Sequence, residues 1–188
     1  MSLLISSSLY DPYIQNNNDG ALKKETVKCC NRATSIGDVD EHSQSSLNTG
    51  EKLGVTSFGD KMYVATYADC STEEEPVVKV GQYEVRINDV NPNNATKLEL
   101  FALMSYLDKN GALNNRGISS YSKIKAFSYQ AEANGYCSGL DDIEKIFSQK
   151  RDWISILNNA KETFLGNSET YHQALEIDKM IFSLSCKW

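Results

Sequence analysis

The chain has 188 residues, of which 40% are hydrophobic and 23% charged, and its formal net charge is −6. A chain of this length and composition forms one globular domain with a buried core, with or without a tail. Its basic residues are not clustered, which argues against nucleic-acid binding because phosphate contacts need grouped Lys and Arg side chains.

Cysteine and histidine content argues against the common metal sites and disulfide frameworks. The five cysteines contain no CxxC pair, and the chain has only two histidines. We therefore expect no metal centre, no cofactor and reduced thiols, as in a cytoplasmic protein. The first residues lack a secretory signal pattern, and no stretch approaches the ~20 apolar residues of a membrane span.

Residues 1–54 are rich in Ser, Asn and Gly and show no sustained apolar period. They predict a polar N-terminal arm that is largely extended or mobile, because few apolar side chains are present to offset the entropy of ordering it. The composition changes at Val55, and residues 55–188 predict a second region that holds a β-ribbon and a helical domain.

Two segments of this second region are predicted strands. Residues 61–68 are dense in β-forming side chains, and residues 77–87 alternate apolar and polar positions. We expect them to form a two-stranded antiparallel ribbon. Because a lone hairpin is marginal in water, its apolar face must pack on the helices that follow.

The first helix is predicted from its cap. Pro92 ends the preceding strand, and Thr96 followed by Glu99 forms a capping-box pattern at the start of an apolar run. Gly111 supplies a left-handed exit. The asparagines at 91, 93 and 94 are thus interpreted as turn and cap residues, in preference to ligand-binding residues.

Three further helices are predicted, at 120–134, at 140–165, and from a cap at Asn167 or Ser168 onward. The expected buried stripe of the last one comprises Tyr171, Ala174, Leu175, Asp178, Ile181, Phe182 and Ser185. The predicted fold class is therefore α+β, mainly α, with a four-helix C-terminal bundle and a two-stranded antiparallel β-ribbon packed on it.

One arrangement of residues suggests covalent catalysis. Cys137 precedes the predicted helix at 140–165, whose dipole would favour a thiolate, and His172 would act as its base with Asp152 or Asp178 as orienting group. The sequence around Cys137 matches none of the patterns typical of catalytic cysteines. A small Cys-dependent hydrolase is thus an alternative, and an inert thiol is the favoured interpretation.

Three blocks of the sequence resemble a known family. They are Asn94-Ala95-Thr96 with its following helix, Asn134-Gly135-Tyr136, and Lys150-Arg151-Asp152-Trp153. In this order, over residues 77–184, they resemble a family of unknown function from Gram-positive, largely anaerobic bacteria. The resemblance implies a shared helical fold in a bacterial protein, and it implies no catalytic residues.

The favoured function is a non-catalytic protein-binding or adaptor domain in a bacterial cytoplasmic or surface-assembly context. The candidate contact residues are Tyr106, Tyr129, Tyr136, Arg151 and Trp153, together with the free edge of the ribbon. Residues 55–95 carry seven acidic and three basic side chains, which favours a basic partner. Another alternative is a structural component whose N-terminal arm orders on oligomerisation.

Overall fold

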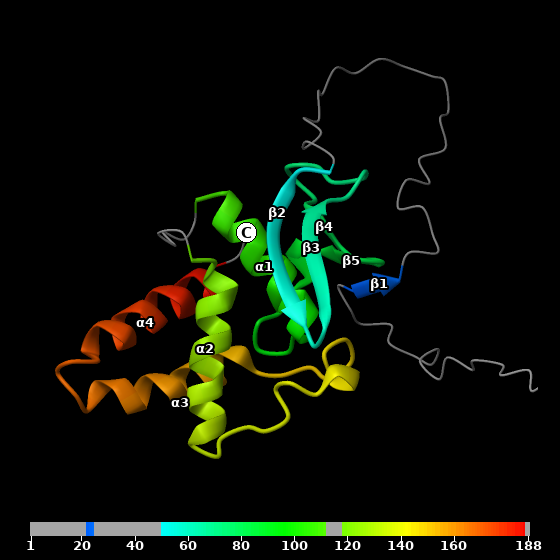
Figure 1. The fold of residues 1–188 in the computed structure, drawn as a ribbon. Coiled ribbons are helices and arrows are strands. Elements are labelled where there is room, and N and C mark those ends of the chain that lie inside the picture. Colours follow the sequence, from blue (N-terminus) through cyan, green and yellow to red (C-terminus); the bar gives the residue numbers. More distant parts are fainter. Residues whose placement is uncertain (1–21, 25–49, 112–117, 187–188) are drawn as a thin grey trace, which may run out of the picture.

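A computed structural model describes residues 22–24, 50–111 and 118–186 of the chain (Figure 1). It is a mixed α+β structure in which an antiparallel sheet lies to one side and the helices lie to the other. Most of the predicted N-terminal arm lies outside the described residues. No helix in the described part is long and apolar enough to cross a membrane.

The sheet contains four strands within residues 52–86 and a short fifth strand at one edge. These strands are β1 (Leu22–Lys24), β2 (Lys52–Phe58), β3 (Lys61–Tyr67), β4 (Val77–Val80) and β5 (Tyr83–Arg86). They pair antiparallel in the order β1-β5-β4-β3-β2.

The prediction of a two-stranded ribbon is therefore wrong. The segment 77–87 is not one strand, because Gly81 adopts a φ of +62° and reverses the chain between Val80 and Tyr83, which pair directly. A two-residue hairpin turn requires such positive φ values, which glycine adopts without steric penalty. Moreover, β2 begins at Lys52, within the region assigned to the arm.

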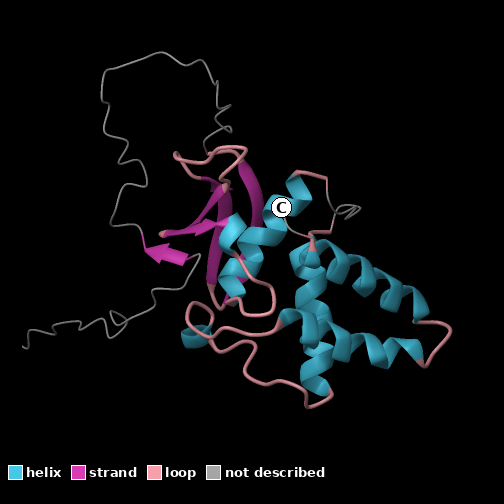
Figure 2. Ribbon diagram, turned by 180° about the vertical axis from the view of Figure 1, so that it is seen from behind, coloured by secondary structure: helices cyan, strands magenta, loops and turns pink. Residues whose placement is uncertain are grey.

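Helix α1 (Lys97–Lys109) is the central element, as predicted, and it packs against β2, β3 and β4 (Figure 2). The predicted capping box is confirmed: the Glu99 backbone N–H donates to Thr96 Oγ1 at 3.2 Å, and the Thr96 N–H donates to Glu99 Oε2 at 2.7 Å. Every residue from 97 to 105 is buried, so the helix forms the layer between the sheet and the remaining helices.

Helices α2 (Ser120–Ala133), α3 (Trp153–Leu165) and α4 (Tyr171–Ser185) pack on one another. Both ribbon views show α3 and α4 side by side, with α2 crossing them (Figures 1 and 2). The predicted stop of α2 is confirmed by a φ of +75° at Gly135 and a bond from the Tyr136 N–H to the Ala131 carbonyl. Since α1 faces the sheet, a bundle of all four helices stays a prediction.

The predicted helix over 140–165 is wrong in its first half. Only a short 3₁₀ turn, η2 (Ile143–Lys145), forms there, and α3 starts at Trp153. Asp152 ends the preceding loop by accepting the Ser155 N–H at 2.9 Å, as a helix N-cap does. Arg151 is held in an antiparallel bridge with Ala95, which fixes it in extended backbone and so excludes a helix across this position.

Candidate functional site

One cavity lies between the end of β2 and the first turn of α1. Its volume is about 230 Å³. The lining residues come from four segments of the chain and are Ser57, Phe58, Gly59, Lys97, Lys125, Tyr129, Asp141 and Ile146. We call it the Lys97 cavity. It brings two lysines, a tyrosine and a carboxylate to one place, which no single sequence motif indicated.

Lys97 is a buried cation at the first position of α1. Its side chain is 7% exposed, and its Nζ donates to the Leu140 carbonyl and lies 3.5 Å from Asp141 Oδ1. Burial lowers the pKa of the Lys97 ammonium, and the Asp141 carboxylate offsets this in part. Loss of solvation disfavours the charged form of any buried lysine, so this residue is closer to deprotonation than a surface lysine.

Tyr129, one of the predicted contact residues, reaches the same cavity. Its hydroxyl donates to Asp141 Oδ1 at 2.6 Å. That hydrogen bond, with a further contribution from Lys97, lowers the pKa of the Asp141 carboxyl, while burial and the adjacent carboxylate raise the pKa of Tyr129. The pair therefore holds a carboxylate and a protonated phenol at neutral pH, and Tyr129 is only partly available as a surface contact.

Arg151, another predicted contact residue, supports the loop beside the cavity. Its guanidinium donates to the carbonyls of Ser138 and Gly139 at 2.9 and 3.1 Å, and to the Gln149 side chain at 2.7 Å. Its positive charge contributes to the lowered pKa of Lys97, as does that of Lys125. Arg151 thus anchors residues 138–139 and adds positive potential next to the cavity.

Tyr121 places a buried hydroxyl next to this group. The residue is 2% exposed, and its hydroxyl has no hydrogen-bond partner within the described part of the chain. Burial raises the pKa of Tyr121, and the nearby Tyr129 and Asp141 raise it further, so it lies within electrostatic reach of the cavity residues. A buried hydroxyl without a partner is uncommon because desolvating it is unfavourable.

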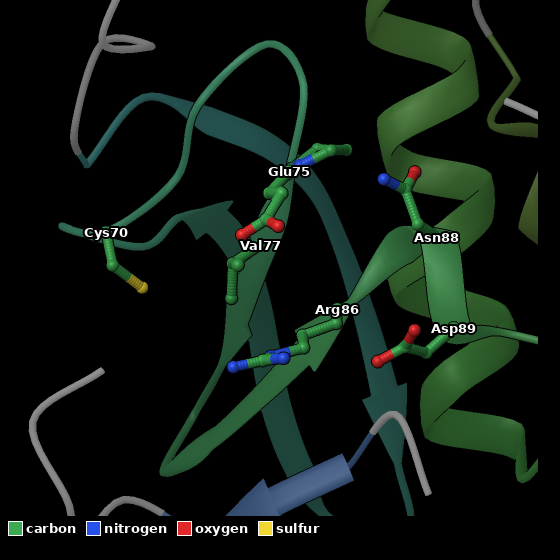
Figure 3. A pocket seen from close by; sticks show the side chains of 7 residues that line it. Cys70, Glu75, Val77, Arg86, Asn88 and Asp89 are labelled. Atoms are coloured by element: carbon green, nitrogen blue, oxygen red, sulfur yellow. The ribbon is translucent and has the colours of Figure 1, made fainter. Parts of the chain in front are cut away.

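A second cavity, with a volume of about 140 Å³, opens beside β4, β5 and the short turn η1 (Ile87–Asp89). In Figure 3, Cys70, Glu75, Arg86 and Asp89 surround Val77. Apart from Val77 and Pro76, its lining residues are exposed or half-buried. It is therefore a surface hollow with mixed charge.

Among the residues that the structure describes, no hydrogen bond or ion pair joins Cys137 to His172 or to either acid considered with it. Burial raises the pKa of the Cys137 thiol, whereas a nucleophile needs a lowered one. The His172 ring contacts its own helix start, at 3.1 Å from the Glu169 carbonyl. Of the two orienting acids considered, Asp152 caps α3 and Asp178 pairs with Lys161 at 2.9 Å. Each of these side chains thus has a local structural role.

The other predicted contact residues lie in different environments. Trp153 is 1% exposed and is therefore not available to a partner, which corrects its assignment to a contact surface. It was misassigned because an amphipathic ring is common both in interfaces and in cores. Tyr106 is half-buried against Tyr67, with ring centroids 6.4 Å apart, whereas Tyr136 is 50% exposed. The three do not form one surface.

An unexpected apolar face lies on α4. The predicted buried stripe of this helix is wrong in its main members, since Tyr171, Leu175 and Phe182 are 47%, 47% and 72% exposed. The residues that pack inward are Ala174, Ile177, Met180, Ser183 and Leu184. We call Tyr171, Leu175 and Phe182 the α4 outer face. This second apolar face could have been found from the sequence, because the helical segment has apolar residues at more positions than one buried face can hold.

Within the described residues, no group of three or more His, Cys, Asp or Glu side chains is placed to hold a metal ion. No protein-family model, no curated protein and no solved structure matches the chain. The resemblance to a bacterial family over residues 77–184 therefore stays a prediction.

Proposed function

We propose that the protein is a non-catalytic protein-binding module whose partner contacts the α4 outer face. The observation that carries the proposal is the exposure of Phe182, the most exposed of the large apolar side chains that the structure describes, at 72%. A large aromatic ring in water is unfavourable, and a contiguous exposed apolar surface commonly marks an interaction site.

The three residues of the α4 outer face form a stripe. With 3.6 residues per helical turn, positions 171, 175 and 182 lie within about 40° of one another around the helix axis. The buried residues Ile177, Met180 and Leu184 lie on the opposite side. A helix that is apolar on two opposite sides is expected between two layers of protein, and α2 and α3 supply only one of these layers.

The composition of the stripe suits an anchor. Aromatic side chains are enriched among the few residues that supply most of the binding energy in an interface. Asp178, which pairs with Lys161 of α3 at 2.9 Å, lies on the same side of α4 between Leu175 and Phe182. The α4 outer face therefore carries an ion pair among its apolar side chains, and protein interfaces commonly combine such apolar anchors with polar groups.

The partner is inferred to be a basic protein. The chain carries a formal net charge of −6, so two copies repel each other whereas a basic partner is attracted. An unlike partner is therefore favoured over self-association, and the assembly role that depends on oligomerisation has less support.

Site-directed photo-crosslinking tests the proposal. A benzophenone amino acid replaces Phe182 in one variant and Met62, which is 69% exposed on β3, in the matched control. Irradiation in the cells that produce the protein is expected to yield a discrete heterologous adduct from position 182 and none from position 62. Excess unlabelled wild-type protein should abolish the adduct, whereas excess Phe182→Ala protein should not.

Two outcomes would overturn the proposal. One is an adduct pattern that is the same at positions 182 and 62, which indicates nonspecific contact. The other is competition by Phe182→Ala protein as strong as that by wild type. An adduct consisting of two copies of this chain would instead assign the α4 outer face to self-association, contrary to the charge argument.

A further inference from the structure

Lys97 occupies a position that is unfavourable for a cation on two counts. Its side chain is 7% exposed, so its ammonium has lost most of its hydration. It is also the first residue of α1, where the helix dipole presents its positive end. An apolar side chain of similar length would fill the same space without a charge, but it would not make the hydrogen bond to the Leu140 carbonyl.

The Asp141 carboxylate beside Lys97 does not fully compensate for the lost hydration of the ammonium or for the helix dipole. Asp141 Oδ1 lies 3.5 Å from Lys97 Nζ, and the Asp141 side chain is itself 68% exposed. Asp141 also accepts the Tyr129 hydroxyl at 2.6 Å. Its charge is thus shared between two donors and screened by solvent.

The charges around the cavity have a positive excess. Lys97 and Lys125 line it, and Arg151 is close enough to act on Lys97. The acidic groups nearby are Asp141 and Glu132, whose Oε1 accepts the Leu140 backbone N–H at 3.4 Å. Among the residues that line the cavity, two lysines therefore stand against one carboxylate, in a chain whose formal net charge is −6.

We propose that the Lys97 cavity binds a small phosphate-class oxyanion, either inorganic phosphate or the phosphate group of a small phosphomonoester. Lys97 and Lys125 supply the charge, and Ser57, which also lines the cavity, offers a hydroxyl as a further donor. A lysine ammonium has three N–H donors, and Lys97 uses two of them toward Leu140 and Asp141. The third is left for a bound anion.

The size of the cavity limits the ligand. A volume of about 230 Å³ is below the roughly 300–1,000 Å³ of pockets for drug-sized molecules. A tetrahedral anion with a short substituent fits this volume. Lysine binds phosphate as a point charge, so two lysines and a serine hydroxyl are compatible with a phosphate group.

The alternative role of Lys97 is purely structural, holding the Leu140 carbonyl against α1. The two roles differ in what they require of Lys125, which lines the cavity but is not needed for that hydrogen bond. Lys125→Gln is therefore the diagnostic variant. Its matched control is Lys123→Gln, which removes the same charge two positions away on α2, where Lys123 pairs with Glu176 of α4.

The experiment is a titration of the full-length protein with inorganic phosphate at constant ionic strength, followed by amide NMR. We expect saturable shifts at residues 57–59, 97, 125 and 141, with glycerol 3-phosphate as a second arm and acetate as a negative arm. Lys125→Gln should weaken phosphate binding by about tenfold, since it removes a charge-assisted hydrogen bond. Lys123→Gln should bind as wild type does.

Three results would overturn the proposal. The first is the absence of saturable shifts in the millimolar range for both phosphate compounds. The second is equal weakening by Lys125→Gln and Lys123→Gln, which indicates general surface charge. The third is an equal response to acetate, which indicates a site without phosphate selectivity.

Discussion

The indole Nε1–H of Trp153 donates to the Ala95 carbonyl oxygen at 2.8 Å, which joins two segments that lie 58 positions apart. The Arg151 backbone N–H donates to the same oxygen at 2.9 Å, and the Trp153 backbone N–H donates to the Pro92 carbonyl at 2.9 Å. The residues before α1 and those before α3 thus form one clamp. Two of the blocks that carry the family resemblance meet here, so their role in this chain is structural.

Replacing Trp153 with Phe should destabilise the protein. The change removes the bond to Ala95 and part of a side chain that is 1% exposed, and we expect a loss of about 1–3 kcal/mol in the free energy of unfolding. Urea denaturation measures it. Tyr136→Phe, at a position 50% exposed, should change that free energy by less than about 0.5 kcal/mol. Equal effects of the two substitutions would contradict this role of the clamp.

The capping box of α1 gives a second prediction. Thr96→Ala removes the acceptor of the Glu99 N–H and should lower the free energy of unfolding by about 1 kcal/mol. Thr96→Ser keeps the hydroxyl and should retain most of that stability. Thermal and urea unfolding of both variants provide the measurement, and similar losses in the two would show that the Thr96 methyl group, not the cap, is responsible.

For a substitution at Tyr121 we expect no loss of stability, in contrast to those at Trp153 and Thr96. Because its buried hydroxyl has no partner among the described residues, Tyr121→Phe removes a desolvated polar group without breaking a hydrogen bond in that part of the chain. We expect the free energy of unfolding to stay the same or rise by about 1 kcal/mol. A clear loss of stability in urea denaturation would indicate that the hydroxyl has a partner in the protein in solution.

The Tyr129–Asp141 pair predicts a pH dependence. The Tyr129 hydrogen bond lowers the pKa of Asp141 in the folded protein, so its contribution to stability is present above the pKa of the unfolded chain. That contribution is lost as the pH falls through the folded-state pKa.

Carboxyl-carbon NMR titration should find the pKa of Asp141 below the ordinary range for aspartate. Tyr129→Phe should raise it toward that range, and Tyr136→Phe, a substitution at an exposed tyrosine, should leave it unchanged. The interpretation would be wrong if Asp141 titrated identically in wild type and Tyr129→Phe.

Cys137 should react slowly. Burial raises the pKa of its thiol, so less thiolate is present at neutral pH than in a free thiol, and the thiolate is the reactive form. Alkylation by iodoacetamide, followed by mass spectrometry at Cys137, should be slower than alkylation of glutathione at pH 7 and should accelerate as the pH rises. A rate faster than that of glutathione would revive the hydrolase alternative.

Local sequence signals determined those features that depend on neighbouring residues. The Thr96–Glu99 capping box, the left-handed exit at Gly111 and the end of α2 at Gly135 are set by spacings of three to five positions, and they were predicted correctly. The start of α3 was missed although Asp152 is a good N-cap, because the apolar period continues through residues 143–150 and favours a longer helix.

Tertiary structure decided what depends on distant partners. Pairing of β2 with β3 placed Lys52 and its neighbours in the sheet, and packing against α2 and α3 selected which of two apolar sides of α4 is buried. The Lys97 cavity draws its residues from β2, α1, α2 and the loop at 141–146. Spacing along the chain specifies hydrogen bonds within a turn of helix, but it does not specify which surfaces meet, because burial depends on the combined fit of all elements.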